Sequence, residues 1–208
     1  MTGLRSSLTI TKMLLAIDIG NTNITLGLFS GENLTTTWRI SADPAKMPDE
    51  YCLLLCQLLD QKKFSFAHLD HVVMCSVVPT ITPIFEHLCQ YYLDMSPLVV
   101  DSDTDTGITI LYERPSDVGA DRIVDAAAAM RLYGGPIIIV DIGTATVFDA
   151  VTEEGLYLGG AIAPGLAVAA DSLFRSTSQL RRVGLRPPPR AIGTNTPHAM
   201  QSGLVFGY

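Results

Sequence analysis

The chain has 208 residues, of which 48% are hydrophobic and 17% are charged, and its formal net charge is −7. This composition supplies enough apolar side chains for a packed core, in one large domain or two small ones. Its 14 Lys and Arg residues are scattered and form no basic stripe, which argues against a nucleic-acid-binding surface. The longest weakly polar stretch, 158–170, is short and interrupted by glycine and proline, so we expect no membrane span.

The N-terminal residues and the cysteines bear on the cellular compartment. Residues 1–12 are polar, precede a second methionine and lack the apolar core of a signal peptide, so we expect an extension to the folded chain. The cysteines show no Cys-x-x-Cys pair and are too few for a disulfide scaffold. Cys52 and Cys56 are four apart in an apolar helical pattern, which favours core thiols. These features predict a cytoplasmic protein without a zinc site.

The first half of the chain predicts a three-stranded meander followed by alternating helices and strands. Short apolar runs rich in β-branched residues indicate buried strands, and apolar residues at helical spacing indicate helices. The expected elements are strands over 14–19, 24–29 and 34–40, a helix over 47–61, a strand over 71–78, a helix over 82–92 and a short strand over 98–100. This order is typical of a β/α layer with a mixed sheet.

The second half repeats the opening of the first half. Before this repeated part lies a polar loop over 101–116, which is interrupted by an apolar segment at 108–112. The expected elements are a helix over 119–134, a hairpin over 137–152, a strand over 156–162, a helix over 166–174, an extended proline segment at 187–189 and a helix over 199–208. Counterparts of the later helix and strands of the first half do not follow, so we expect the second half to be truncated.

The repeat is clearest at two Asp-Ile-Gly turns. Asp18-Ile19-Gly20 and Asp141-Ile142-Gly143 each follow an apolar run and precede small polar residues and further β-formers. The glycine permits a tight turn and a close approach to the backbone, and a carboxylate at a strand end can hold a cation. Turn amides and threonine hydroxyls can bind phosphate. Two ordinary turns in a repeated fold are the alternative, but the repetition favours a nucleotide cleft.

Asp121 is the candidate general base. It opens the helix expected after Gly119, where the helix N-terminus favours a negative charge. A carboxylate there could accept the proton of an alcohol during phosphoryl transfer, and Arg122 could hold an anionic or amide part of the substrate. An acidic first turn with a surface Asp–Arg pair is the alternative. The P-loop and Rossmann glycine motifs are both absent.

The motifs taken together resemble the type III pantothenate kinase family over residues 13–208. Each motif is short, but their number and order are specific. The matching segments, in order, are Asp18-Ile19-Gly20-Asn21-Thr22-Asn23, Gly119-Ala120-Asp121-Arg122, Asp141-Ile142-Gly143-Thr144-Ala145, Gly159-Gly160-Ala161-Ile162-Ala163-Pro164-Gly165, Gly193-Thr194-Asn195-Thr196 and Met200-Gln201-Ser202-Gly203.

This resemblance implies a fold and an activity. The fold is the α/β architecture shared by acetate and sugar kinases, heat-shock proteins and actin, with two ribonuclease-H-like halves around a cleft. The halves would be 13–116 and an incomplete 117–208. The activity is ATP-dependent phosphorylation of pantothenate to 4′-phosphopantothenate, the first step of coenzyme A biosynthesis. The resemblance also implies Mg²⁺, a K⁺ or NH₄⁺ ion, and a cytoplasmic homodimer.

The resemblance further assigns roles to individual residues. Asp121 would be the catalytic base, Asp141 would bind the monovalent cation, and Asp18 would lie near Mg²⁺. ATP would be bound by Asp18, Ile19, Gly20, Asn21, Thr22, Asn23, Ile24, Thr25 and Thr144. Pantothenate would be bound by Tyr112, Gly119, Ala120, Asp121, Arg122 and Thr196, the last commonly across a dimer interface in this family.

One residue departs from the family pattern, and two other functions are possible for this fold. Val147 stands where the family usually has threonine; the valine keeps the shape of the side chain but lacks the hydroxyl.

One alternative function is a nucleotide-binding regulatory or accessory protein without kinase activity. Such a protein would act through a protein partner, because basic surface for DNA is lacking. The Gly-Ala-Asp-Arg segment favours an enzyme over this alternative. The other alternative is a kinase for a different sugar or acid.

Overall fold

The computed structural model describes residues 12–208, so the predicted extension lies outside the described residues except for Lys12. The chain divides into two compact units that exchange short segments. Unit 1 comprises the residues up to Thr106 together with Ser116–Val124, and unit 2 comprises Gly107–Pro115 and Asp125–Tyr208. The predicted boundary between residues 116 and 117 lies inside this exchanged region.

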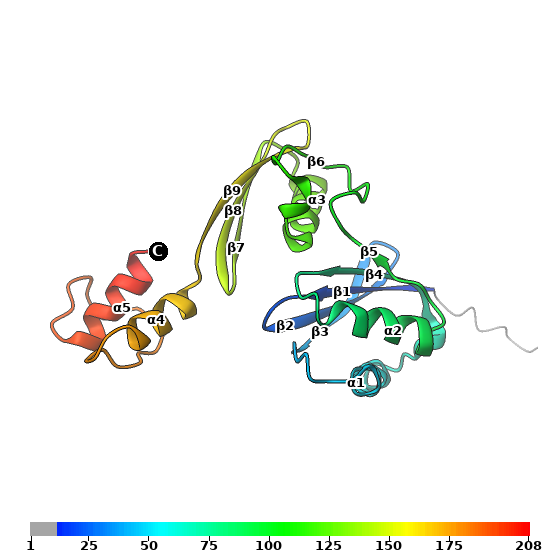
Figure 1. The fold of residues 1–208 in the computed structure, drawn as a ribbon, viewed down its shortest axis with the longest axis horizontal. Helices are drawn as coiled ribbons and strands as arrows, with labels where there is room; N and C mark the ends of the chain where they lie inside the picture. Colours follow the sequence, from blue (N-terminus) through cyan, green and yellow to red (C-terminus); the bar gives the residue numbers. More distant parts are fainter. Residues whose placement is uncertain (1–11) are drawn as a thin grey trace, which may run out of the picture. The chain divides into compact units, whose positions relative to one another are not determined.

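Unit 1 contains a five-stranded mixed sheet with two helices on one face (Figure 1). Its elements are β1 (Met13–Ile19), β2 (Asn23–Ser30), β3 (Asn33–Ser41), α1 (Pro48–Gln61), a 3₁₀ turn (Phe66–His68), β4 (Leu69–Ser76), α2 (Thr82–Tyr92) and β5 (Leu98–Val99). The strand order is β3-β2-β1-β4-β5, in which β1 pairs antiparallel with β2 and parallel with β4. This is the ribonuclease-H-like arrangement predicted for the first half, so that prediction is confirmed.

The core of unit 1 lies between its sheet and the two helices. Alternate residues of β1 are buried, as a strand with one covered face requires. From α1, the buried side chains include Tyr51, Leu55 and Leu59, which recur every four residues on one face. From α2, Phe85 packs against Tyr51, with ring centroids 4.9 Å apart. The side chains of β1 that alternate with the core, including Asp18, therefore lie on the opposite face of the sheet.

Unit 2 contains a four-stranded sheet and most of the remaining helices. The elements that follow β5 are β6 (Thr109–Ile110), a 3₁₀ turn (Pro115–Asp117), α3 (Ala120–Tyr133), β7 (Ile137–Ile142), β8 (Ala145–Val151), β9 (Leu156–Pro164), α4 (Leu166–Arg175) and α5 (Thr196–Phe206). The strand order is β6-β9-β8-β7. Its antiparallel β9-β8-β7 meander repeats the β3-β2-β1 meander of unit 1, as the sequence predicted. The mixed α/β fold class is therefore confirmed.

Three details differ from the predicted elements. Strand β4 ends at Ser76 rather than 78, because the chain turns there and the Ile81 N–H donates to the Val78 carbonyl. Helix α5 begins at Thr196 rather than 199, because the Asn195 side chain caps it by accepting from the His198 N–H at 2.9 Å. The segment predicted only as an apolar interruption of the loop forms β6, which pairs parallel with β9.

The cysteines agree only partly with the predicted core thiols. Cys52 is buried, and burial raises the pKa of its thiol to about 11. Cys56, in contrast, is exposed, so its predicted burial was wrong: the buried face of α1 runs through Cys52 and Leu55, and Cys56 lies just beyond its edge. All four cysteines are free thiols. None of the described helices is long and apolar enough to cross a membrane.

Candidate functional site

The first Asp-Ile-Gly turn joins β1 to β2 in unit 1. The Gly20 N–H donates to the Asn23 carbonyl at 3.0 Å and closes the turn. Asn21, Thr22 and Asn23 are exposed at its tip, whereas Ile19 and Ile24 on either side are buried in the core. Buried isoleucines thus fix a turn whose three tip residues are exposed. Such a turn offers backbone amides and hydroxyls to an anionic ligand.

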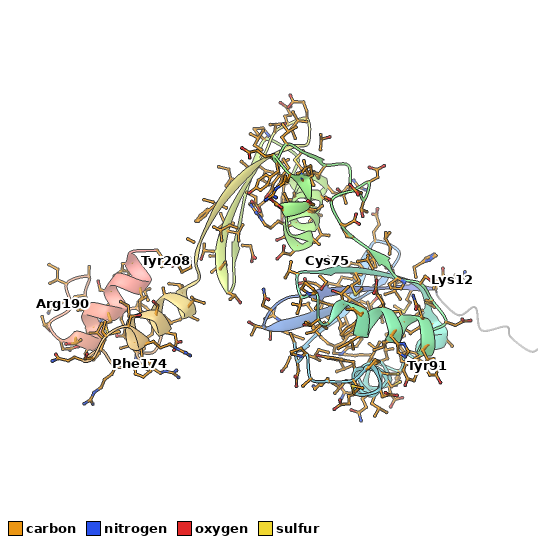
Figure 2. All side chains as sticks on the ribbon, in the orientation of Figure 1. Lys12, Cys75, Tyr91, Phe174, Arg190 and Tyr208 are labelled. Atoms are coloured by element: carbon orange, nitrogen blue, oxygen red, sulfur yellow. The ribbon has the colours of Figure 1, made fainter. Side chains whose placement is uncertain are left out.

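Asp18 lies one residue before the end of β1 and is exposed. It pairs in register with Thr25 of β2 and with Cys75 of β4. The Cys75 side chain, labelled in Figure 2, is buried, and its thiol donates to Asp18 Oδ1 at 3.5 Å. Sequence reasoning did not connect these two residues, since the contact depends on the parallel pairing of β1 with β4. The carboxylate is therefore held at a strand end and is exposed to solvent.

The Gly119–Arg122 region reaches the same end of the sheet in unit 1. Asp121 Oδ1 accepts from the Arg122 N–H at 2.8 Å, at the first turn of α3. A Cβ on Gly119 would lie 2.5 Å from Asp121 Oδ1 and 3.4 Å from Val77 Cγ1. Any residue other than glycine at this position would therefore displace the Asp121 carboxylate. The Val77 N–H in turn donates to the Ile19 carbonyl at 3.0 Å. Asp121 thus belongs to the edge where β1 and β4 end, the edge where α/β sheets usually bind ligands.

Two further predicted residues of this segment are buried in unit 1. Ala120 and Arg122 are each 9% exposed. A buried guanidinium requires partners, and Arg122 has them. The segment is therefore a packed element rather than the solvated acidic turn considered as the alternative.

The second Asp-Ile-Gly turn joins β7 to β8 in unit 2. The Gly143 N–H donates to the Ala145 carbonyl at 2.8 Å and closes this turn, whereas in the first turn the Gly20 N–H donates one residue further along, to Asn23. Asp141 and Thr144 are exposed. The Gly165 N–H donates to the Thr144 carbonyl at 3.0 Å, so α4 begins against the turn. A Cβ on Gly165 would lie 2.2 Å from the Gly143 carbonyl oxygen, which explains why glycine starts this helix.

Tyr112 and Thr196 also belong to unit 2. The Tyr112 ring covers Gly159 of β9, where a Cβ would lie 2.9 Å from Tyr112 Cε2. Thr196 is exposed at the start of α5, next to the capping Asn195. The predicted site residues thus fall into two sets. Unit 1 brings the first turn and Asp121 to one edge, and unit 2 carries Tyr112, the second turn and Thr196.

A cavity of about 400 Å³ in unit 1 contains none of the predicted site residues. It lies where β1 and β4 begin, at the opposite ends of the strands from Asp18. Its lining residues are Leu14, Asp70, His71, Val72, Val73, Met95, Ser96 and Leu98. These side chains are mostly apolar, so we do not assign phosphate chemistry to this cavity.

Comparison with known proteins identifies the family. A family model described as type III pantothenate kinase matches residues 14–208. The Moorella thermoacetica type III pantothenate kinase is 50% identical over 196 residues, which cover 94% of this chain and 77% of that protein. The Symbiobacterium thermophilum type III pantothenate kinase 2 is 48% identical over 196 residues, covering 94% and 74%. The chain belongs to the type III pantothenate kinase family. The predicted family and the enzyme class, a kinase, are both confirmed.

One solved structure supports the same fold at lower identity. A conserved Baf family protein from Campylobacter jejuni matches with a TM-score of 0.52 and 22% identity, covering 93% of this chain and 74% of that chain. At 22% identity, this similarity is evidence for the fold alone.

The residues present fit the metal chemistry that a type III pantothenate kinase implies. Magnesium is usually held by one or two carboxylates, with water and substrate phosphates completing its shell. An exposed carboxylate at a strand end, such as Asp18 beside the first turn, meets that requirement. Within residues 12–208, no group of three or more His, Cys, Asp or Glu side chains is placed to hold a metal. An exposed carboxylate of this kind could hold a metal together with a bound phosphate.

Sequence reasoning also missed two buried polar residues of β8. Asp149 is 3% exposed and accepts from the Tyr157 hydroxyl at 2.7 Å. Thr146 is 4% exposed, and its Oγ1 has no hydrogen-bond partner among the described residues. A signal was available for Asp149, because an acid inside a strand of alternating apolar residues is unusual in a sequence.

Proposed function

We propose that this chain phosphorylates pantothenate at its primary hydroxyl, with Mg²⁺-bound ATP as the donor, to give 4′-phosphopantothenate in the first step of coenzyme A biosynthesis. The observation that carries the proposal is the position of Asp121. Its carboxylate lies at the strand edge that also holds the first turn, and Gly119 leaves it room. Membership of the type III pantothenate kinase family supplies the substrate class.

In the proposed reaction, the Asp121 carboxylate accepts the proton of the pantothenate hydroxyl as that oxygen attacks the γ-phosphorus. The new O–P bond forms while the bond between the γ-phosphorus and the bridging oxygen of ADP breaks. Little covalent chemistry is required of the protein, so orientation of the two substrates contributes most of the rate. The amides of Asn21, Thr22 and Asn23 and the hydroxyl of Thr22 would bind the phosphates, and Arg122 would bind pantothenate.

We further propose that the two Asp-Ile-Gly turns supply the charge balance of the same reaction. Asp18 would hold Mg²⁺ together with the phosphates, and Asp141 would hold a K⁺ or NH₄⁺ ion near Thr144. These cations would offset phosphate charge, since neither turn contains lysine. Tyr112 and Thr196 would contact pantothenate, and the active form would be a homodimer.

The proposal is tested by the product. The chain, incubated with Mg²⁺ and ATP and a panel of alcohols that includes pantothenate, simple sugars and other hydroxy acids, is analysed by mass spectrometry. We expect one phosphoryl group to be added to pantothenate in preference to the others. Preferential phosphorylation of a sugar or another acid would contradict the proposed substrate.

Asp141→Ala should remove activation by potassium. The substitution deletes the only carboxylate of the second turn, so the rates in potassium and sodium buffers should become equal. Asp60→Ala, an exposed change at the end of α1, serves as the control and should keep the potassium dependence. Steady-state rates at matched ionic strength provide the measurement, and an unchanged potassium dependence in Asp141→Ala would exclude the proposed role.

Gly119→Ala should lower kcat by about 10- to 100-fold, since displacing a catalytic group by about 1 Å has effects of that size. The new Cβ would lie 2.5 Å from Asp121 Oδ1, which a rotation of the carboxylate relieves without moving the backbone. The melting temperature should therefore change little. Gly184→Ala, where a Cβ meets nothing within 4 Å, is the matched control. A Gly119→Ala variant with a normal kcat would show that the observed position of Asp121 is not needed.

A further inference from the structure

Unit 2 contains a buried acid–phenol pair whose role the reaction proposed above does not explain. Asp149 of β8 and Tyr157 of β9 are 3% and 0% exposed, and the Tyr157 hydroxyl donates to Asp149 Oδ1 at 2.7 Å. A buried carboxylate is costly unless donors surround it, so the pair is bound tightly. Gly160 lies opposite Asp149 in the β8–β9 register, and a Cβ there would lie 2.5 Å from Asp149 Oδ1. The local backbone is thus fitted to this carboxylate.

The pair is linked directly to Tyr112. The rings of Tyr112 and Tyr157 have centroids 5.9 Å apart and are tilted by 51°, a favourable aromatic geometry. The Leu111 N–H donates to the Tyr157 carbonyl at 3.0 Å, which fixes the backbone just before Tyr112. Gly159, with φ of +114°, lets the Tyr112 ring lie against the β9 backbone. Tyr112 is therefore placed by β9 on one side and by the Tyr157 ring on the other.

We infer that Asp149 and Tyr157 are positioning residues that hold Tyr112 in the orientation in which it contacts the acid substrate. The inference rests on the proposed function, because it takes Tyr112 as a pantothenate contact. Hydrogen bonding to Asp149 fixes the Tyr157 ring, and the Tyr157 ring limits the rotation of Tyr112. Neither Asp149 nor Tyr157 needs to touch substrate.

Tyr157→Phe should raise the KM for pantothenate about fivefold to tenfold, the effect of one hydrogen bond, while the KM for ATP stays unchanged. Tyr133→Phe, which changes a tyrosine 79% exposed in the same unit, is the matched control and should leave both constants unchanged. Asp149→Asn keeps an acceptor for the Tyr157 hydroxyl, so its KM for pantothenate should stay within about twofold of wild type.

A double-mutant cycle separates positioning from a general structural role. If Tyr157 acts through Tyr112, Tyr157→Phe should change the KM for pantothenate in the wild-type chain but not in a Tyr112→Ala background. An equal effect in both backgrounds, or no effect in the wild-type chain, would overturn the inference. If Tyr157→Phe does not fold, the same cycle is run with Asp149→Leu and is read in the same way. A wild-type chain that does not turn over pantothenate would instead refute the proposed function, and the inference with it.

Discussion

Asp121→Asn should reduce pantothenate-dependent turnover by at least about 1000-fold, the scale expected when a general base and its charge are both lost. The amide matches the carboxylate in shape, and its oxygen can still accept from the Arg122 N–H that Asp121 binds at 2.8 Å. The first turn of α3 should therefore stay intact, and ATP binding should change little. Turnover and ATP affinity are measured on the same preparation, together with the far-UV circular dichroism spectrum.

A matched control shows whether the loss is specific. Asp60→Asn makes the same chemical change at an exposed position near the end of α1 and should retain the wild-type rate. A near-normal rate for Asp121→Asn would remove Asp121 as the base. The Asp121 carboxylate would then be only a cap for α3.

Gly160→Ala should destabilise the protein by roughly 3 kcal/mol or more, at the upper end of what overpacking costs. A Cβ there would lie 1.8 Å from the Phe148 carbonyl oxygen and 2.5 Å from Asp149 Oδ1. The first of these atoms belongs to the backbone of β8, so the β8–β9 pairing itself must shift. The change should appear as an earlier loss of far-UV circular dichroism on heating or in urea.

A control and a second probe locate this effect. Gly203→Ala lies in α5, where a Cβ meets nothing within 4 Å, and should stabilise that helix by about 1 kcal/mol at most. Trp38, the single tryptophan, lies in β3, so its fluorescence reports on unit 1. Identical unfolding curves for Gly160→Ala and the wild type would show that the close approach at Gly160 does not constrain the fold.

The repeated turns were predictable because their signal is local. An apolar run ending in Asp-Ile-Gly determines a strand and a turn through the burial of Ile19 and Ile24 and the tight closure at Gly20. The spacing of apolar residues also predicted helix α2 at Thr82–Tyr92 and the two three-stranded meanders. Asp121 was predictable as a candidate for a similar reason, since the first turn of a helix is readable from sequence.

The remaining features depend on pairings that no local pattern encodes. Strand β6 is two residues long and gains its partner from β9, so neither the support of Tyr112 nor the exchange of segments between the units could be predicted. The Cys75–Asp18 contact likewise requires the parallel register of β1 with β4. Cys56 shows the limit of helical periodicity, because spacing alone does not give the edge of the buried face.

The central claim, that this chain is a pantothenate kinase, is tested most directly by ADP release from Mg²⁺-bound ATP, with and without pantothenate, in potassium and in sodium buffer. We predict turnover that requires pantothenate and is faster in potassium. ADP release that is equal with and without pantothenate, or absent while ATP still binds, would contradict the claim and favour the nucleotide-binding regulatory alternative.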